Sequence, residues 1–235
     1  MTGLDELHVV VPVRDEEDLL PRCLDAVAVA ALSLSQVPGA PRVTVIAVLD
    51  RCGDGSEEVA LTRSVETLHC DAGRVGAARR LGVARVQALT AGVSPQRIWV
   101  ATTDADSAVP EHWLREHVRA AEAGAHVATG PVHPDPHELS TLLLARWHER
   151  HGIETVTSVV HGANLGFRLD GYLAVGGFLD LPEHEDVRLV GALLAAGARR
   201  DELPAVLTSA RREGRTPGGF AGYLRTLAAG EAEVG

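Results

Sequence analysis

The first half of the chain alternates short apolar runs with longer segments that show helical periodicity. Each run is continuous and rich in β-branched residues, which is typical of strands buried on both faces of a parallel sheet. These runs predict five strands, over residues 7–13, 43–49, 65–69, 97–103 and 126–132.

Helices are predicted in the segments between these strands. Residues 16–34 carry acidic residues in the first turn, which the helix dipole favours, and Ser56 is a candidate cap for a helix over residues 57–64. Residues 74–91 form an alanine-rich helix, and Pro110 takes the favoured first position of the next one. Strands and helices in this alternation predict an α/β fold with a doubly wound, mostly parallel sheet.

The second half of the chain is less regular. Helices are expected over residues 139–150, 187–196 and 219–229, and strands over residues 155–160 and 165–168. Because we find no internal repeat and no linker, we expect a single domain over residues 1–235.

Composition narrows the class of partner. The 235 residues are 46% hydrophobic and 23% charged, as in ordinary globular proteins. The formal net charge is −10 and aromatic residues make up 3%, so the chain lacks the positive charge and the stacking surfaces that nucleic acid requires. All 22 basic residues are arginine, which binds phosphate and carboxylate groups bidentately.

Targeting signals are absent from the sequence pattern. The first residues lack a basic region before their apolar run, and no run reaches the roughly 18 apolar residues of a membrane span. Cys23, Cys52 and Cys70 are not at metal-ligand spacing, and the histidines form no zinc-protease motif. We therefore expect a cytoplasmic protein without an integral membrane segment.

Acidic residues follow three of the predicted strands. Asp50 follows the second, Asp71 the third, and Asp104 and Asp106 the fourth, while Arg14 follows the first. Ligands of doubly wound sheets bind beyond the carboxyl ends of the strands, so these acids are candidates for holding a cation or a ribose.

The triplet Asp104–Ala105–Asp106 is the sharpest local feature. Two carboxylates past a buried strand are suited to a hard divalent cation that completes its shell with phosphate oxygens and water. Such a cation makes a diphosphate a good leaving group. The alternative is an ordinary surface loop or helix cap.

Asp50 has two interpretations as well. A carboxylate at a strand end is suited to accept an N–H of a nucleobase, and the glycines of the following loop allow close approach. The alternative is a plain strand–turn–helix loop in which Asp54 and Ser56 are turn and cap residues.

Glu185 and Asp186 precede a predicted helix. They are candidates for a general base toward an acceptor hydroxyl, or for acids favoured by the helix dipole. Candidates for an acceptor pocket are His161–Gly162–Ala163–Asn164 and Gly176–Gly177–Phe178. Candidates for a diphosphate clamp are Arg211, Arg212 and Arg215. Plain turns are the alternative for both groups.

The order of these motifs resembles family 2 glycosyltransferases with the GT-A fold, over residues 9–223. Six segments carry the likeness: VVVPVRDEEDLLPRCLDAV, VIAVLDRCGDGS, GRVGAARRLGVA, WVATTDADSAVPEHWL, HGANLGFRLDGYLAVGGF and LPEHEDVRLVGALLAAG. The resemblance implies a Rossmann-like, mostly parallel sheet flanked by helices. It also implies a nucleotide-binding half over about residues 1–133 and a smaller, mixed α/β acceptor-binding half over about residues 134–235.

The resemblance assigns roles position by position. Asp50 is implied to hold the base, Asp106 with Asp104 a divalent cation (Mn²⁺ or Mg²⁺), and Arg212 or Arg215 the diphosphate. The full set implied for the donor is Pro12, Val13, Arg14, Glu16, Asp50, Arg79, Asp104, Arg212 and Arg215.

On the acceptor side, the resemblance implies that Asp186 is the catalytic base and that Glu185 holds the acceptor. His161, Gly162 and Asn164 are expected to line its pocket. The family implies inversion at the anomeric carbon by direct displacement.

The chain departs from the family pattern in three ways. Arg80 stands where the family has asparagine, and no histidine follows His184 to serve the metal. The tail carries no membrane helices, which favours a single transfer over polymer export.

These features lead to an expected donor, with other classes left open. A UDP-sugar is favoured and a GDP-sugar is the alternative, while the hydroxyl acceptor is unidentified. The apolar last helix predicts packing on the core or on a second copy in a homodimer. The alternatives are a retaining transferase of the glucosyl- or mannosyl-3-phosphoglycerate synthase type, a nucleotidyltransferase and a non-catalytic nucleotide-sugar binder. The absence of a basic Gly-rich loop after the first strand disfavours the nucleotidyltransferase.

Overall fold

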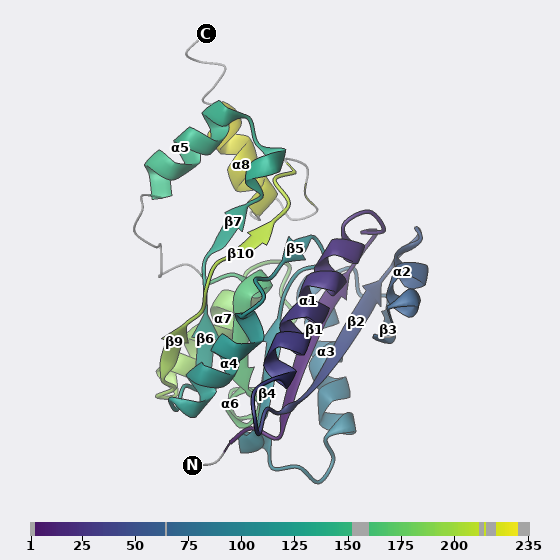
Figure 1. Ribbon diagram of the computed structural model, residues 1–235, viewed down its shortest axis with the longest axis vertical. Coiled ribbons are helices and arrows are strands. Elements are labelled where there is room, and N and C mark those ends of the chain that lie inside the picture. Colours follow the sequence, from purple (N-terminus) through teal and green to yellow (C-terminus); the bar gives the residue numbers. More distant parts are fainter. Residues whose placement is uncertain (1–2, 64, 152–159, 212–213, 215–219, 230–235) are drawn as a thin grey trace.

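A seven-stranded sheet forms the centre of the protein, and helices cover both of its faces (Figure 1). The computed structural model describes residues 3–63, 65–151, 160–211, 214 and 220–229. In order across the sheet, the strands are β3 (Glu66–Cys70), β2 (Arg42–Asp50), β1 (Glu6–Val13), β4 (Ile98–Thr102), β8 (Leu165–Arg168), β6 (Val127–Thr129) and β9 (Arg200–Glu202).

A smaller sheet joins three short strands, in the order β5 (Ser107–Ala108), β10 (Val206–Thr208) and β7 (Val132–Pro134). The α-helices are α1 (Leu20–Ser35), α2 (Ser56–Thr62), α3 (Val75–Leu89), α4 (Trp113–Glu122), α5 (Thr141–His151), α6 (Leu169–Ala174), α7 (Glu185–Ala195) and α8 (Phe220–Ala229). Short 3₁₀ turns are η1 (Pro95–Arg97), η2 (Pro136–Glu138) and η3 (Gly162–Asn164).

The predicted α/β fold with a mostly parallel sheet is confirmed. Strands β3, β2, β1 and β4 are parallel, with Val10 of β1 opposite Ile46 of β2 and Thr102 of β4. Strand β8 departs from the expected pattern, since it lies between β4 and β6 and is antiparallel to both. Because β8 and β9 come from the expected acceptor-binding half, the two halves share one sheet.

The strand expected over residues 126–132 is divided between the two sheets. Strand β6 belongs to the large sheet and β7 to the small one. Gly130 lies between them, where a side chain would overlap the Asn164 amide, and Pro131 has no N–H with which to continue a ladder. The apolar pattern does not reveal this break because both strands remain largely buried.

The two faces of the large sheet bury separate cores. Helices α1 and α4 pack with Val9 and Val11 of β1, whereas α3, α6 and α7 pack on the opposite face with Val10. Successive residues of a strand point to opposite faces. The prediction that β1 is buried on both faces is therefore confirmed.

Two helices of the nucleotide-binding half begin differently from the prediction. Helix α1 begins at Leu20 rather than at residue 16, with Pro21 in its first turn, where no backbone N–H is needed. Ser56 is the first residue of α2 and not its cap. Its hydroxyl instead accepts a hydrogen bond from the Glu16 N–H at 2.8 Å, which joins two loops.

The other corrections concern α4, α7 and one strand. Helix α4 begins at Trp113, so Pro110 precedes the helix instead of opening it. Helix α7 begins at Glu185, which places this residue and Asp186 inside its first turn. The strand expected over residues 155–160 lies outside the described residues except for its last position.

Helices α5 and α8 lie side by side at one end of the molecule, next to β7 and β10 (Figure 1). They bury a third apolar cluster, in which Leu224 and Leu227 of α8 pack with Leu143 and Trp147 of α5. The apolar face of the last helix therefore packs within the chain, and the homodimer stays a prediction.

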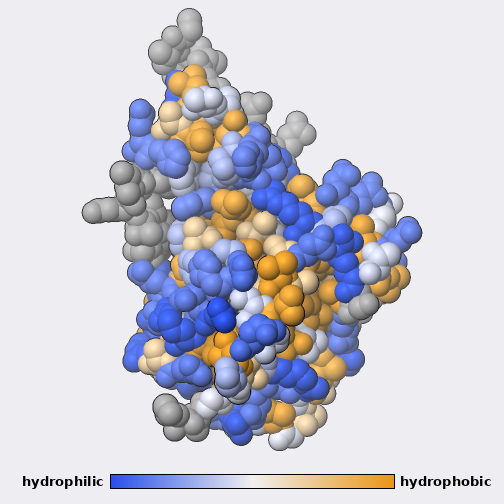
Figure 2. Space-filling view, viewed as in Figure 1, coloured by the Kyte–Doolittle hydropathy of each residue, from blue (hydrophilic) through white to orange (hydrophobic). Residues whose placement is uncertain are grey.

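Polar and apolar residues are intermixed on the face that Figure 2 shows. Exposed apolar side chains include Val29 and Leu32 on α1 and Leu61 on α2. Among the described residues, no helix combines the length and apolar character needed to cross a membrane.

We expect Gly82→Ala to destabilise the protein, because a methyl group at this position of α3 would overlap Val10 of β1. Overpacking of this kind costs about 1–3 kcal/mol of unfolding free energy, measured by urea denaturation. Gly191→Ala in α7 is the matched control, since nothing lies within 4 Å of the added methyl group. There we expect a gain of about 0.5–1 kcal/mol. Equal effects of the two substitutions would contradict the prediction.

Candidate active site

Asp50 and Arg14 both contact the loop that follows β3. Asp50 ends β2 and is buried, and its Oδ1 accepts a hydrogen bond from the Gly73 N–H at 2.9 Å. Arg14 Nη1 donates to the Gly73 carbonyl oxygen at 3.5 Å. Gly73 has a φ of 67°, a conformation that glycine adopts without strain. The carboxyl ends of β1, β2 and β3 are thereby tied together at one edge of the sheet.

Pro12 and Val13 end β1 opposite residues 48 and 49 of β2. The Val13 side chain is buried in the core on the α1 side of the sheet, whereas Pro12 is partly exposed. Of these two side chains assigned to the nucleotide, Pro12 is therefore the one that a ligand can reach.

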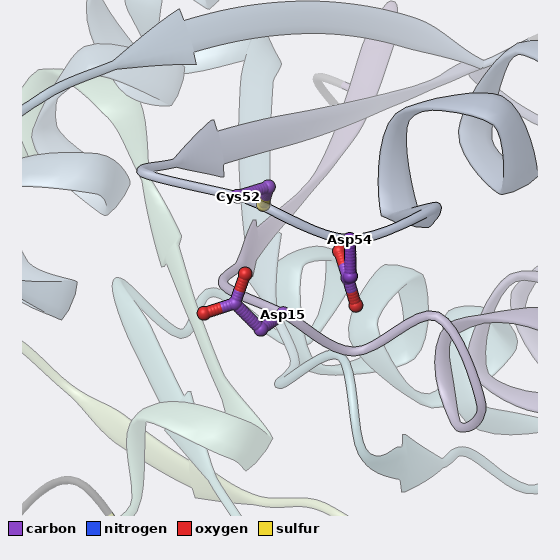
Figure 3. A group of neighbouring side chains, drawn as sticks. All are labelled: Asp15, Cys52 and Asp54. Atoms are coloured by element: carbon purple, nitrogen blue, oxygen red, sulfur yellow. The ribbon is translucent and has the colours of Figure 1, made fainter.

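The loops after β1 and β2 hold each other through side chains that accept backbone hydrogen bonds (Figure 3). Asp15 Oδ1 accepts from the Gly53 N–H at 2.7 Å, and Asp54 Oδ2 accepts from the Glu17 N–H at 2.9 Å. Asp15, Cys52 and Asp54 bring three potential metal-ligand atoms within 4.8 Å of one another. Because both carboxylates already bind backbone N–H groups, we interpret this cluster as a loop clamp. The sequence analysis did not identify it.

Asp106 is positioned by the small sheet. The hydroxyls of Thr208 and Ser107 donate to its Oδ1 at 3.2 and 3.3 Å, and its side chain is 14% exposed. Arg211, just after β10, makes an ion pair with its Oδ2 at 2.8 Å. Two of these three partners, Thr208 and Arg211, lie about a hundred residues further along the chain.

Glu16 and Arg211 form a bidentate pair. Arg211 Nη1 and Nη2 donate to the two Glu16 carboxylate oxygens at 2.8 and 2.6 Å, and Glu16 is buried. Arg211 thus lies between Glu16 and Asp106. Arg212 and Arg215, which the sequence assigns to the diphosphate, lie outside the described residues, so Arg211 is the member of this basic cluster that the structure places at the site.

The pKa of Asp106 is raised from 3.8 to about 6. Burial is the largest cause, followed by repulsion from the Asp104 carboxylate, while Arg211 acts in the opposite direction and Glu16 adds repulsion. The raised pKa of Asp106 therefore reflects its burial first, and the neighbouring carboxylates of Asp104 and Glu16 second.

Arg79, which the resemblance places near the nucleotide or diphosphate, is buried against two acids of the site. Its residue is 3% exposed, and its guanidinium donates to Asp104 Oδ1 at 2.5 Å and to the Glu185 carboxylate. Burial alone would lower the pKa of Arg79, but the carboxylates of Asp104 and Glu185 outweigh it and raise that pKa. Arg79 and Glu185 therefore face each other inside the protein, and neither the expected diphosphate contact nor the expected acceptor contact fits this burial.

Asp186 lies next to this pair, in the first turn of α7. Its Oδ2 accepts a hydrogen bond from the Gly162 N–H at 2.6 Å, and its Oδ1 accepts from the Val187 N–H at 2.8 Å. Asp186 is only partly buried, in contrast to Glu185. Of the two acids, Asp186 is the one accessible to a substrate.

Asn164, expected in the acceptor pocket, is fully buried and satisfied within the protein. Its amide nitrogen donates to the carbonyl oxygens of Pro131 and Pro204, and its Oδ1 accepts from Trp113 Nε1 at 2.9 Å. Asn164 therefore ties η3 to the segments after β6 and β9 and to α4, and this geometry does not support a contact with an acceptor. His161 remains a candidate, partly exposed and edge-on to the ring of Phe220.

Four carboxylates and two guanidinium groups therefore meet at the carboxyl edge of the sheet. Arg211 forms ion pairs with Glu16 and Asp106, and Arg79 forms ion pairs with Asp104 and Glu185. The excess of acid is suited to a cation, and the adjacent, partly exposed Asp186 is suited to accept a proton.

The model of glycosyl transferase family 2 matches residues 8–169, which is more than half of the chain. The chain belongs to glycosyl transferase family 2. This confirms the family expected from the motifs, and with it the class of enzyme. Glu185, Asp186 and Arg211 lie beyond the matched residues, so their roles depend on the geometry described above.

Solved structures similar to this one are GT-A glycosyltransferases. TarS 1–349 of S. aureus in complex with UDP has a TM-score of 0.60 and 15% identity, and the alignment covers 95% of this chain and 64% of that one. The mannosyltransferase PcManGT of Pyrobaculum calidifontis, in complex with GDP-Man and Mn²⁺, has a TM-score of 0.60 and 17% identity, with 97% and 75% covered. At such identities the similarity establishes the fold alone.

Glucosyl-3-phosphoglycerate synthase of Mycobacterium tuberculosis, in complex with Mn²⁺, UDP-Glc and phosphoglyceric acid, has a TM-score of 0.58 and 14% identity, with 98% and 81% covered. This chain spans 39% of the longer TarS chain. No curated protein matches the sequence.

We expect Asp106→Asn to remove a pH dependence of stability that the wild-type protein has without divalent cations. Since the folded-state pKa is raised from 3.8 to about 6, the folded protein keeps a proton that the unfolded chain has lost. The contribution of this group to the unfolding free energy of the wild type therefore falls by about 2 kcal/mol as the pH rises from about 4 to about 7. Urea denaturation in EDTA at both pH values measures this difference.

Asp18→Asn, at an exposed carboxylate, is the control and should keep the wild-type pH dependence. If wild type and Asp106→Asn lose stability in parallel over this range, Asp106 does not carry the effect.

Proposed function

We propose that this protein transfers a sugar from a nucleotide-diphosphate sugar to a hydroxyl group of an acceptor, with inversion and with the assistance of a divalent cation. One observation carries the proposal. Asp104, in the Asp-x-Asp triplet at the end of β4, and Asp186, the accessible acid of α7, are linked through the buried pair of Arg79 and Glu185. A donor-side acid and a candidate base are thereby neighbours in a family 2 glycosyltransferase fold.

The donor site is supported by the edge formed at β1, β2 and β3. Asp50 is the candidate for holding the base, beside Arg14 and Pro12, and Asp104 is the candidate for the ribose. UDP, UDP-Glc and GDP-Man occupy the similar structures, which supports a nucleoside diphosphate sugar as the donor class. We favour a UDP-sugar, with a GDP-sugar as the alternative.

A divalent cation fits the charges of this site. Carboxylate oxygens are the ligands that Mg²⁺ and Mn²⁺ prefer, and the four carboxylates of this site outnumber its two guanidinium groups. Asp106 would hold the ion, with help from Asp104, and the ion would neutralise charge on the leaving diphosphate. Similar structures contain Mn²⁺ or Mg²⁺. Arg211 takes part because it already contacts Asp106 and carries the charge to bind phosphate oxygens.

Asp186 is the proposed general base. The Gly162 and Val187 N–H groups fix the orientation of its carboxylate and leave it partly exposed. It takes the proton of the acceptor hydroxyl while the acceptor oxygen forms the bond to the anomeric carbon and the nucleoside diphosphate leaves. His161, near Phe220, and the backbone of Gly162 border the space where the acceptor is expected.

Retaining transfer of the glucosyl-3-phosphoglycerate synthase type is a second candidate, favoured by the similarity to that enzyme. The anomeric configuration of the product, measured by NMR, distinguishes the two. Nucleotide binding without any turnover would instead favour a non-catalytic binder.

We expect nucleoside diphosphates to raise the thermal stability of the protein in a manganese-dependent manner. A ligand at a hundred times its Kd stabilises by about 2.7 kcal/mol. Asp106→Asn should lose the manganese-dependent part of this shift, because it removes the proposed metal ligand. Glu122→Gln, at an exposed carboxylate at the end of α4, should keep it. Unchanged manganese dependence in Asp106→Asn would refute the metal assignment.

We expect Asp186→Asn to bind the donor as the wild type does and to lower kcat by about 10²–10⁴-fold, because the amide cannot accept the acceptor proton. The assay is the release of nucleoside diphosphate with a panel of hydroxyl acceptors. Glu183→Gln, three residues earlier, is the control and should retain turnover. Near-normal turnover of Asp186→Asn would exclude Asp186 as the base.

A further inference from the structure

Arg79 of α3 connects two parts of the site that are far apart in sequence. One end of its guanidinium donates to Asp104 at the end of β4, and the other end donates to Glu185 in the first turn of α7. Arg79 and Glu185 are each 3% exposed, so both side chains are shielded from water over most of their surface. An ion pair of this kind responds strongly when one partner moves, because a buried charge without its partner is costly.

The hydrogen bonds of the Arg79 guanidinium join two carboxylates and do not maximise the stability of the fold. Arg211 binds the Glu16 carboxylate with both of its Nη atoms, which is the stronger geometry, and contacts Asp106 in addition. Arg79 divides its Nη atoms between two carboxylates, and its buried Nε atom has no hydrogen-bond partner. A buried donor without a partner lowers stability. The geometry therefore holds two acids at a fixed separation at some cost to the fold.

Glycines allow the surrounding elements to come this close. A Cβ atom at Gly76 of α3 would lie 2.8 Å from Cγ of Glu185. A Cβ atom at Gly162 of η3 would overlap the guanidinium of Arg79. Helix α3, turn η3 and helix α7 therefore meet at Arg79 without intervening side chains.

The turn η3 extends the connection to Asp186. The Gly162 carbonyl oxygen accepts a hydrogen bond from Thr102 Oγ1 at 2.5 Å, and its N–H donates to Asp186 Oδ2 at 2.6 Å. The Gly162 peptide thus lies against Arg79 and orients the carboxylate of Asp186. A shift of Asp104 can reach Asp186 by two routes, through Glu185 along α7 and through Gly162.

We propose that Arg79 is a positioning residue that couples Asp104 on the donor side to the orientation of Asp186 on the acceptor side. The coupling itself is a property of the fold, and its catalytic meaning rests on the proposed transferase function. Arg79 touches neither substrate, since it is enclosed by protein, and it acts through Asp104, Glu185 and Gly162. The planar guanidinium of Arg79 donates hydrogen bonds to two carboxylates at once, and a lysine ammonium does not reproduce this geometry.

The first test uses the ligand-free protein, so it does not depend on the transferase assignment. Amide hydrogen exchange is followed at Gly162 and Val187, whose N–H groups bind Asp186. We expect Asp104→Asn to speed exchange at both amides by about fivefold or more, the range of ordinary site–site coupling. In an Arg79→Lys background the same Asp104→Asn change should have no further effect. Glu122→Gln, at the exposed end of α4, is the control and should leave both amides unchanged.

Two results would overturn the proposal. Wild-type exchange at both amides in Asp104→Asn would show that no coupling exists. An undiminished Asp104→Asn effect in the Arg79→Lys background would show that Arg79 does not carry it. If Arg79→Lys does not fold, an Arg79→Met, Glu185→Met double variant replaces it, since apolar residues of similar volume often replace a buried ion pair without loss of stability.

The second test is kinetic, with the nucleotide sugar that the stability panel identifies. We expect Arg79→Lys to lower kcat by about a hundredfold at saturating donor, because the geometry of Asp186 is lost, with a much smaller change in donor Kd. Arg80→Lys, at the exposed neighbouring position, should keep the wild-type kcat. Wild-type kcat in Arg79→Lys would refute the positioning role. Failure of every nucleotide to bind would refute the proposed function, and the exchange experiment would still decide the coupling.

Discussion

Two guanidinium groups hold together the carboxylates on which the whole site depends. Arg211 pairs with Glu16 and Asp106, and Arg79 pairs with Asp104 and Glu185. Acids this close and this buried would otherwise repel one another or take up protons. Each arginine also spans a large sequence separation, 195 residues for Arg211 and Glu16 and 106 for Arg79 and Glu185. The contacts that reduce the repulsion between these acids therefore also join distant parts of the chain.

The sheet supplies the frame for these contacts. Parallel strands β1, β2 and β4 deliver Arg14, Asp50 and Asp104 to one edge because all three strands run in the same direction. The antiparallel strand β8 then brings η3 to the end of β4, where Thr102 binds the Gly162 carbonyl oxygen. The small sheet adds Thr208 and Arg211 beside Asp106. Segments from the second half of the chain therefore complete a site of which the first half supplies only a part.

The sequence predicted the parts of this arrangement that local pattern determines. The strands near β1, β2, β3 and β4 were found because continuous apolar runs mark strands buried on both faces, and the strand-end acids followed from them. The insertion of β8 and the partners of Arg79 were not predictable, since pairing direction and ion pairs across 106 residues leave no local signal. The internal hydrogen bonds of Asn164 leave no local signal for a similar reason. A polar residue beside glycines resembles a pocket residue until its partners, Trp113 and two proline carbonyl groups, are known.

The close approaches at Gly76 and Gly162 have a consequence for how such a site changes in evolution. At these positions the needed property is the absence of a side chain, because Glu185 and Arg79 fill the space directly above the backbone. An exchange of glycine for alanine is chemically mild, yet here it would displace a buried charge. Two apparently neutral positions therefore limit which side chains this site tolerates, and a protein that kept the acids but not these glycines would have to build the site in another way.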